Sequence, residues 1–179
     1  RGRGRHPMMD PTKQKTTIDT EGESTADETV LGVKRTGTPS TYEIEVAGGY
    51  PAEERYKRGP VAFIECVEAI PCNPCETACP YGAITVGADI TNLPQLDGDK
   101  CIGCGLCIPV CPGLAIVVRD FAFSDTRARI SFPYEYLPLP EVGERVTLCD
   151  RNGEAVCEGE TLRVRIPKRN DHTAVVEIA

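Results

Sequence analysis

The sequence is poor in aromatic residues and histidine, and it lacks the common nucleotide-binding motifs. Its 179 residues include no Trp, six Tyr, four Phe and two His. No GxGxxG fingerprint and no P-loop occurs. His6 and His172 have no neighbours in sequence that suggest a Cys–His or Ser–His–Asp set. We therefore expect no catalytic site in this chain itself.

Long hydrophobic runs are also missing. The longest apolar stretch, residues 108–118, contains two prolines and a glycine and is far shorter than the ~20 residues of a spanning helix. The first 30 residues contain no apolar segment of the kind found in secretory signals. We expect a cytoplasmic, reducing setting with no membrane span, where clustered cysteines serve as metal-binding thiolates more readily than as disulfides.

The net charge of −7 is unevenly distributed along the chain. Residues 1–60 carry equal numbers of basic and acidic side chains, residues 61–112 sum to −5, and residues 113–179 sum to −2. This balance argues against a general nucleic-acid role. An acidic middle segment favours docking to a basic patch on a partner, although plain solubility explains the charge equally well.

Three segments follow from the composition. Residues 1–59 are polar and are expected to form an extended or partly disordered arm, with one strand at residues 41–46. The basic start of this arm is interpreted as a solvated tail. Residues 60–120 hold most of the cysteines, and residues 121–179 form a small β-rich domain.

The cysteine-rich segment contains an internal duplication. Each half has a cysteine loop, a short helix, a Cys-Pro pair and a strand. Such a repeat predicts a small α+β unit with pseudo-two-fold symmetry. The expected strands are residues 61–66, 82–86 and 113–120, the expected helical regions are 72–79 and 101–111, and residues 87–100 connect the halves.

Residues 121–179 show no helical periodicity. The expected strands are residues 128–132, 145–149, 154–159, 161–166 and 173–178. Asn152–Gly153 predicts a two-residue hairpin turn. We expect a small β-sheet or partly open barrel; alternatively, these strands extend the sheet of the cysteine-rich segment.

Two cysteine motifs carry the chemistry. The second reads Cys101-x-x-Cys104-x-x-Cys107-x-x-x-Cys111-Pro112, which matches the run that holds 4Fe–4S clusters in bacterial ferredoxins. Three thiolates two residues apart can each bind one corner of a cubane. A proline after the last cysteine ends the short helix.

The first motif is looser than the second. Cys72, Cys75 and Cys79–Pro80 fit the same run, but Cys66 lies three residues too far upstream. We interpret Cys66 as the first ligand, in a loop enlarged by an insertion within residues 67–71. Alternatively, Cys66 is a buried strand cysteine and one corner of that cluster is open or substituted.

Residues 60–118 thus resemble a bacterial-type dicluster ferredoxin domain over about a third of the chain. The stretch IPCNPCETACPYGAI also resembles the ferredoxin-like small subunit of flavoprotein dehydrogenase complexes. The resemblance implies two 4Fe–4S clusters with crossed ligation: Cys66, Cys72, Cys75 and Cys111 for cluster 1, and Cys79, Cys101, Cys104 and Cys107 for cluster 2.

Other metal sites fit less well. Repeated C-x-x-C pairs can build a four-thiolate zinc site, which is the second candidate. The order C-x2-C-x3-C is the reverse of the motif in radical enzymes that cleave S-adenosylmethionine, so the sequence does not indicate an enzyme of that class. A Rieske centre needs two histidine ligands, and both histidines are far from the motifs.

Apolar residues lie between the ligands in both motifs, and they include Ile70, Ile102 and Leu114. We expect them first of all to form the core, where they would also keep water away from the clusters. Tyr81, directly after a Cys-Pro pair, is expected simply to pack.

Two cysteines fall outside the motifs. Cys149 and Cys157 flank the expected turn, but pairing about that turn sets Cys149 opposite Val156. We therefore expect small hydrophobic residues and no disulfide.

The leading functional hypothesis is an electron-transfer subunit of a larger oxidoreductase, with a flavoprotein as its partner. A free soluble ferredoxin-type carrier is the first alternative. A module in which the clusters serve only as structural staples is the second.

Overall fold

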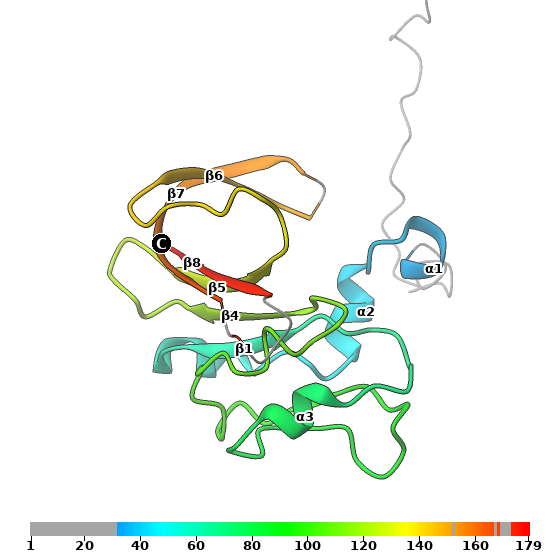
Figure 1. The fold of residues 1–179 in the computed structure, drawn as a ribbon. Helices are drawn as coiled ribbons and strands as arrows, with labels where there is room; N and C mark the ends of the chain where they lie inside the picture. Colours follow the sequence, from blue (N-terminus) through cyan, green and yellow to red (C-terminus); the bar gives the residue numbers. More distant parts are fainter. Residues whose placement is uncertain (1–31, 152, 167, 169–172) are drawn as a thin grey trace, which may run out of the picture.

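The computed structural model describes residues 32–151, 153–166, 168 and 173–179. Its main feature is a six-stranded antiparallel sheet with the strand order β1-β4-β5-β8-β7-β6, accompanied by a two-stranded sheet of β2 and β3 (Figure 1). The strands are β1 (Val61–Ile64), β2 (Ile84–Thr85), β3 (Gln95–Leu96), β4 (Ile116–Asp120), β5 (Arg129–Tyr134), β6 (Arg145–Cys149), β7 (Ala155–Arg165) and β8 (Ala174–Ile178). The helices are α1 (Val33–Thr36), α2 (Thr41–Val46), the 3-10 helix η2 (Glu53–Arg58) and α3 (Pro74–Ala78). This mixture confirms the predicted α+β class.

The cysteine-rich segment forms two antiparallel strand pairs. β1 pairs with β4, with Ile64 opposite Ile116, and β2 pairs with β3, with Ile84 opposite Leu96. All four residues of β1 are buried. The cysteine loops and α3 lie at the end of the molecule opposite the β6–β7 hairpin (Figure 1).

The C-terminal strands extend this sheet. β5 pairs with β4, with Val118 opposite Ser131, and it also pairs with β8. Val175 of β8 is fully buried in the same core as Ile64, Ile84 and Ile116. The strand pairing and the core therefore both continue across the expected boundary at residues 120 and 121.

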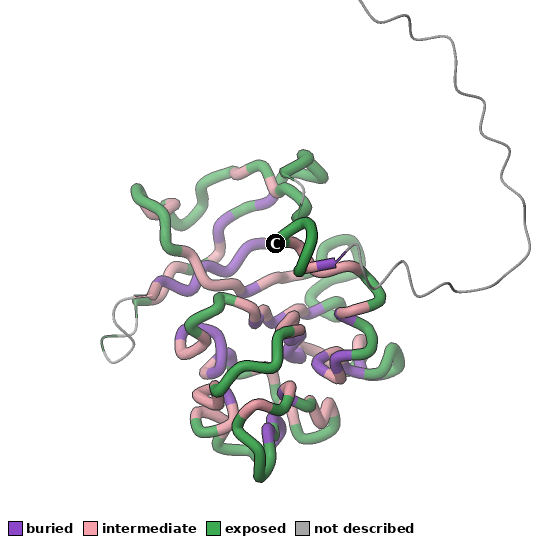
Figure 2. Tube along the Cα trace, turned by 90° about the vertical axis from the view of Figure 1, so that its right-hand side faces the viewer, coloured by how far each residue is buried: buried purple, intermediate pink, exposed green. Residues whose placement is uncertain are grey.

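The predicted strands at residues 154–159 and 161–166 are a single strand, β7. Its first half pairs with β6, and its second half pairs with β8. A register shift lies between Thr161 and Arg163. This register shift bends β7, so its two halves can follow different neighbouring strands. Figure 2 shows the buried segments in the sheet and the largely exposed outer hairpin.

The prediction of a strand at residues 41–46 is wrong, because these residues form α2. The composition TYEIEV favours a strand, but a capping box begins a helix here. The Glu43 N–H donates to Ser40 Oγ at 3.2 Å, and the Ser40 N–H donates to Glu43 Oε2 at 2.7 Å. Local capping outweighs the β propensity of Thr, Tyr, Ile and Val.

The short helix expected within residues 101–111 does not form as an α-helix. The Ile108 N–H donates to the Gly105 carbonyl at 3.2 Å, and the Cys111 N–H donates to the Ile108 carbonyl at 3.4 Å. These bonds span three residues and make successive tight turns. Two glycines, at positions 103 and 105, both with positive φ, explain why a regular helix is not favoured there.

The turn between β6 and β7 is longer than predicted. The Gly153 N–H donates to the Asp150 carbonyl at 3.0 Å, and the Asp150 N–H donates to the Glu154 carbonyl at 2.9 Å. Asn152, half of the predicted two-residue turn, lies outside the described residues. Cys149 consequently pairs with Ala155, not with Val156.

The described part of the N-terminal arm packs against both sheets. The Leu96 N–H donates to the Gly48 carbonyl and the Ile64 N–H to the Gly49 carbonyl, each at 3.0 Å. Residues 1–31, which include most of the expected disorder, lie outside the described residues. Within the described ranges, no helix has the length and apolar character that crossing a membrane requires.

Candidate metal centre

Four of the predicted ligands line one hollow beside β1 and β4. They are Cys79, Cys101, Cys104 and Cys107. Backbone amides point at two of the sulfurs: the Ala62 N–H donates to Cys101 Sγ at 3.4 Å, and the Ala83 N–H donates to Cys79 Sγ at 3.3 Å. Hydrogen bonds of this kind stabilise thiolates that bind a metal.

The other four predicted ligands line a second hollow. They are Cys66, Cys72, Cys75 and Cys111. The Ala115 N–H donates to Cys111 Sγ at 3.4 Å. Cys66 therefore lies with the other three despite its distance in sequence, because the enlarged loop at residues 67–71 returns to the hollow.

Each hollow takes one cysteine from the opposite motif. Cys79 belongs to the first motif but lines the hollow of the second, and Cys111 does the reverse. The structure thus brings the eight predicted residues together in the crossed sets that the resemblance implied.

Matching backbone features recur 32 residues apart in the two motifs. The Gly82 N–H donates to the Cys79 carbonyl at 3.3 Å, and the Leu114 N–H donates to the Cys111 carbonyl at 3.1 Å. Gly82 has φ 61° and Leu114 has φ 52°. Leu114 is the only described non-glycine residue with positive φ, so the second motif keeps this turn even without the glycine.

Burial makes at least one thiol in each hollow a poor acid. It raises the pKa of Cys107 to about 12, and negative charge on Cys101 and Cys104 adds to the effect. Burial also raises the pKa of Cys75 to about 11. The pKa of Cys66 is raised by burial and then by charge on Cys111. Four thiolates this close repel one another, so a positively charged metal core is needed to hold them deprotonated.

The donor set fits an iron–sulfur cubane. Within the described ranges, no group of three or more Cys, His, Asp or Glu could hold a single metal ion. A zinc site draws all four sulfurs to about 2.3 Å from one ion. A cubane instead gives each thiolate its own iron, so the sulfurs surround a volume. Four cysteines around each hollow match the second arrangement.

Some apolar residues of the motifs lie at the openings of the hollows. Ile70, Ile102 and Leu114 were expected in the core, but each is exposed. Ile102 and Tyr81 line the hollow of Cys101, and Ile70 lines that of Cys66. Tyr81, for which the sequence favoured simple packing, is half exposed at this rim. The sequence does not show which of these residues lie in the core and which lie at the rim, because apolar residues next to a cysteine occur in both places.

Cys149 and Cys157 take no part in either hollow. Both are exposed. Cys157 lies opposite Leu148, whereas Cys149 lies opposite Ala155, so the two side chains project from opposite faces of the hairpin. The sequence-based expectation that they do not form a disulfide agrees with all ten cysteines being free. Their exposure differs from the expected burial as small hydrophobic residues.

Comparison with known proteins defines the class. Residues 63–120 match the 4Fe–4S dicluster domain family. The segment is therefore a dicluster iron–sulfur domain whose cofactors are two 4Fe–4S clusters, and both of these predictions are confirmed. The match also supports an iron–sulfur electron-transfer role.

Similar proteins include components of redox complexes. A subunit of an ion-translocating oxidoreductase complex from Methanosarcina acetivorans is 43% identical over 53 residues, covering 30% of this chain and 19% of the relative. The corresponding subunit of a Na⁺-translocating ferredoxin:NAD⁺ oxidoreductase complex from Acetobacterium woodii is 45% identical over 38 residues, covering 21% and 11%.

A third relative is an uncharacterised ferredoxin from Methanocaldococcus jannaschii. It is 38% identical over 64 residues, which cover 36% of this chain and 34% of the relative. The matched segment thus spans about a third or less of each of these three relatives. No solved structure gives a significant match to the chain.

Proposed function

We propose that this chain is an electron-transfer subunit that relays electrons through two 4Fe–4S clusters within a larger oxidoreductase complex. The observation that carries the proposal is the gathering of eight cysteines around two hollows, four to each. Cluster 1 is held by Cys66, Cys72, Cys75 and Cys111, and cluster 2 by Cys79, Cys101, Cys104 and Cys107. When bound, such clusters accept and release single electrons.

We further propose that the two halves of the domain are a pseudo-symmetric repeat. The equal spacing of the Cys79–Gly82 and Cys111–Leu114 turns supports it. So does the N–H···S bond four residues after each crossed cysteine, from Ala83 and from Ala115. Both hollows border one core, which includes Ile84, Ile116 and Val175. A shared rigid core would hold the two clusters at a fixed separation.

The partner is proposed to be a larger redox subunit, with a flavoprotein as the specific candidate. Two of the relatives are named as subunits of oxidoreductase complexes. The loop between β5 and β6 exposes Tyr136 by 75%, Leu137 by 87% and Val142 by 68%. Adjoining exposed apolar residues are typical of interaction sites. We assign residues 121–179, together with the arm, to partner binding, and we propose a reducing, cytoplasmic location.

Purification at native abundance tests the subunit role. Under the proposal, the chain co-purifies with larger redox chains, and substitution of Leu137 by Asp weakens that association while the cluster content stays unchanged. Thr85→Asp, at an exposed position of β2 outside both the arm and residues 121–179, is the control and leaves association intact. A chain that elutes alone near its own mass of 19.4 kDa contradicts the subunit role and supports a free carrier.

Electron paramagnetic resonance separates electron transfer from a structural role. Clusters that transfer electrons give a signal that appears on reduction and disappears on reoxidation through several cycles. Clusters that merely staple the fold give no reversible signal, and that outcome would overturn the proposed function.

A further inference from the structure

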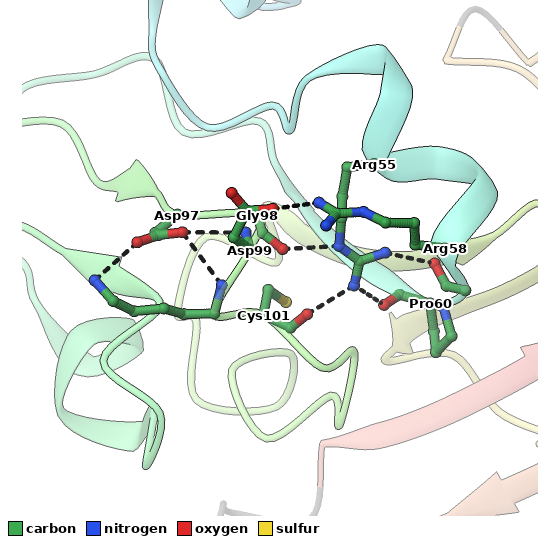
Figure 3. A network of polar contacts seen from close by, with 9 residues as sticks. Arg55, Arg58, Pro60, Asp97, Gly98, Asp99 and Cys101 are labelled. Atoms are coloured by element: carbon green, nitrogen blue, oxygen red, sulfur yellow. Dashed lines mark hydrogen bonds and ion pairs between the residues drawn. The ribbon is translucent and has the colours of Figure 1, made fainter.

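A buried arginine lies beside cluster 2. Arg55 belongs to η2 in the N-terminal arm, outside the cysteine motifs, and is only 7% exposed. Its Nε donates to the Gly98 carbonyl at 2.8 Å and its Nη1 to the Gly59 carbonyl at 3.0 Å. Its Nη2 donates to the carbonyls of Pro60 at 2.9 Å and Cys101 at 2.7 Å (Figure 3).

The guanidinium of Arg55 forms no direct ion pair with a carboxylate among the described residues. Within those ranges, none of the ion pairs involves Arg55. Its four hydrogen-bond acceptors are backbone carbonyls, which satisfy the donors but carry no net charge. By contrast, Arg58, one turn further on, is 57% exposed and paired with Asp99. A buried cation without a counter-ion is costly, so its presence requires an explanation.

The packing fixes Arg55 against the loop of cluster 2. A Cβ added at Gly103 would lie 2.5 Å from Pro60 Cβ and 2.7 Å from Pro60 O. One added at Gly98 would lie 3.4 Å from Arg55 Cγ. Cys101, whose carbonyl accepts from Arg55, is also the cysteine whose sulfur accepts the Ala62 N–H. The position of the Arg55 guanidinium is therefore fixed relative to the cluster 2 loop and to Cys101 Sγ.

The surroundings of cluster 1 have the opposite charge. Glu68, an acidic residue, lines the hollow of Cys66. Among the described residues, neither hollow has an arginine or lysine in its lining, so the charges that distinguish them are Glu68 in the lining of the first and Arg55 behind the Cys101 loop of the second. A cluster with four thiolates is negatively charged and becomes more so when it gains an electron. Net charge and burial near a cluster both set its potential.

We propose that Arg55 supplies the counter-charge of cluster 2 and raises its reduction potential above that of cluster 1. The guanidinium stabilises the reduced form more than the oxidised form, because the added electron increases the attraction. The arm thereby determines which cluster holds the first electron. This inference rests on the proposed function, since it requires that both clusters are redox-active.

The test compares the potentials of the two clusters in the full chain and in three variants. Redox titrations followed by electron paramagnetic resonance give the potentials, and hyperfine-shifted cysteine β-proton resonances assign each potential to a cluster. Arg55→Gln lowers the potential of cluster 2 and leaves that of cluster 1 in place. Arg55→Lys, which keeps the charge, gives a smaller shift. Arg58→Gln, the matched surface control, gives the smallest shift because its charge is exposed and screened.

Equal shifts in Arg55→Gln and Arg55→Lys would overturn the inference, since packing and not charge would then be responsible. So would equal shifts in Arg55→Gln and Arg58→Gln, or a shift in both clusters alike. The wild-type chain gives a second test that depends on no variant: cluster 2 has the higher potential, and the reverse order contradicts the proposal. Failure of the proposed function is distinguishable, because the wild-type clusters would then show no reversible reduction.

Discussion

The two hollows have the same donors but different surroundings. The hollow of cluster 2 uses an evenly spaced motif, two of its sulfurs accept backbone N–H groups, and a buried arginine lies behind Cys101. The hollow of cluster 1 uses an enlarged loop, also has a backbone N–H donated to a sulfur, at Cys111, and includes Glu68 in its lining. The spacing of cysteines therefore specifies which cluster binds, whereas residues from elsewhere in the chain can make two similar clusters differ.

The largest expected effect comes from substituting Cys75, in the first turn of α3, and Cys79, which caps the end of that helix. We expect Cys79→Ser to lose or convert cluster 2 and Cys75→Ser to do the same to cluster 1, so each variant lacks up to about four irons. Iron analysis and the assigned cysteine resonances would identify the cluster that is affected. The two variants serve as controls for each other. Damage to the same cluster by both would contradict crossed ligation.

The contact between the arm and the cluster 2 loop can be broken at Gly103. Gly103→Ala places a Cβ against the backbone of Pro60 at a φ of 67°, so we expect the free energy of unfolding to fall by about 3 kcal/mol, from strain and overpacking together. Anaerobic denaturant unfolding, followed by cluster absorbance, measures this. Gly113→Ala is the control, since it meets no atom within 4 Å, and we expect a change below about 0.5 kcal/mol. A similar decrease in the free energy of unfolding in both variants would contradict a tight contact between the arm and the cluster 2 loop.

A smaller effect tests the repeat itself. Gly82 has φ 61° and open space around its Cα, so Gly82→Ala should lower the free energy of unfolding by about 1 kcal/mol through backbone strain alone. The same denaturant assay applies. The turn should survive, because Leu114 occupies the matching position at φ 52°. Loss of cluster 2 in Gly82→Ala would show that the two turns are not equivalent.

The smallest effect is expected for the cysteines outside the hollows. Cys149 and Cys157 are exposed, so mild alkylation of the cluster-loaded chain should modify these two thiols and spare the eight ligands. Cys149→Ala and Cys157→Ala should each leave iron content and cluster potentials unchanged. A loss of iron in either variant would contradict the division of the ten cysteines into eight cluster ligands and two that bind no cluster.

The sequence predicts the metal centre better than it predicts the flanking structure. The ligand spacing can be interpreted directly, because the run C-x2-C-x2-C-x3-C-P is characteristic of 4Fe–4S ligands. Five strands of the large sheet begin within one residue of their predicted positions, since β-branched runs bounded by turn residues are strong local signals. The strand predicted at residues 41–46 is wrong because it rests on β propensity alone, whereas the Ser40–Glu43 capping box, also visible in the sequence, decides the structure.

Other features cannot be predicted from local patterns. The pairing of β4 with β5 and the burial of Val175 depend on tertiary contacts between distant segments. The role of Arg55 depends on four carbonyls, two of which are more than 40 residues away. An isolated arginine in a polar arm normally indicates a solvated surface, so nothing in the local pattern singles out Arg55.

Iron analysis combined with a reductive titration tests the central claim most directly. Applied to the full chain, purified without oxygen, it should give about eight irons per chain and a reversible paramagnetic signal that reports two interacting reduced clusters. About four irons, or a signal that does not return after reoxidation and a second reduction, would contradict the account.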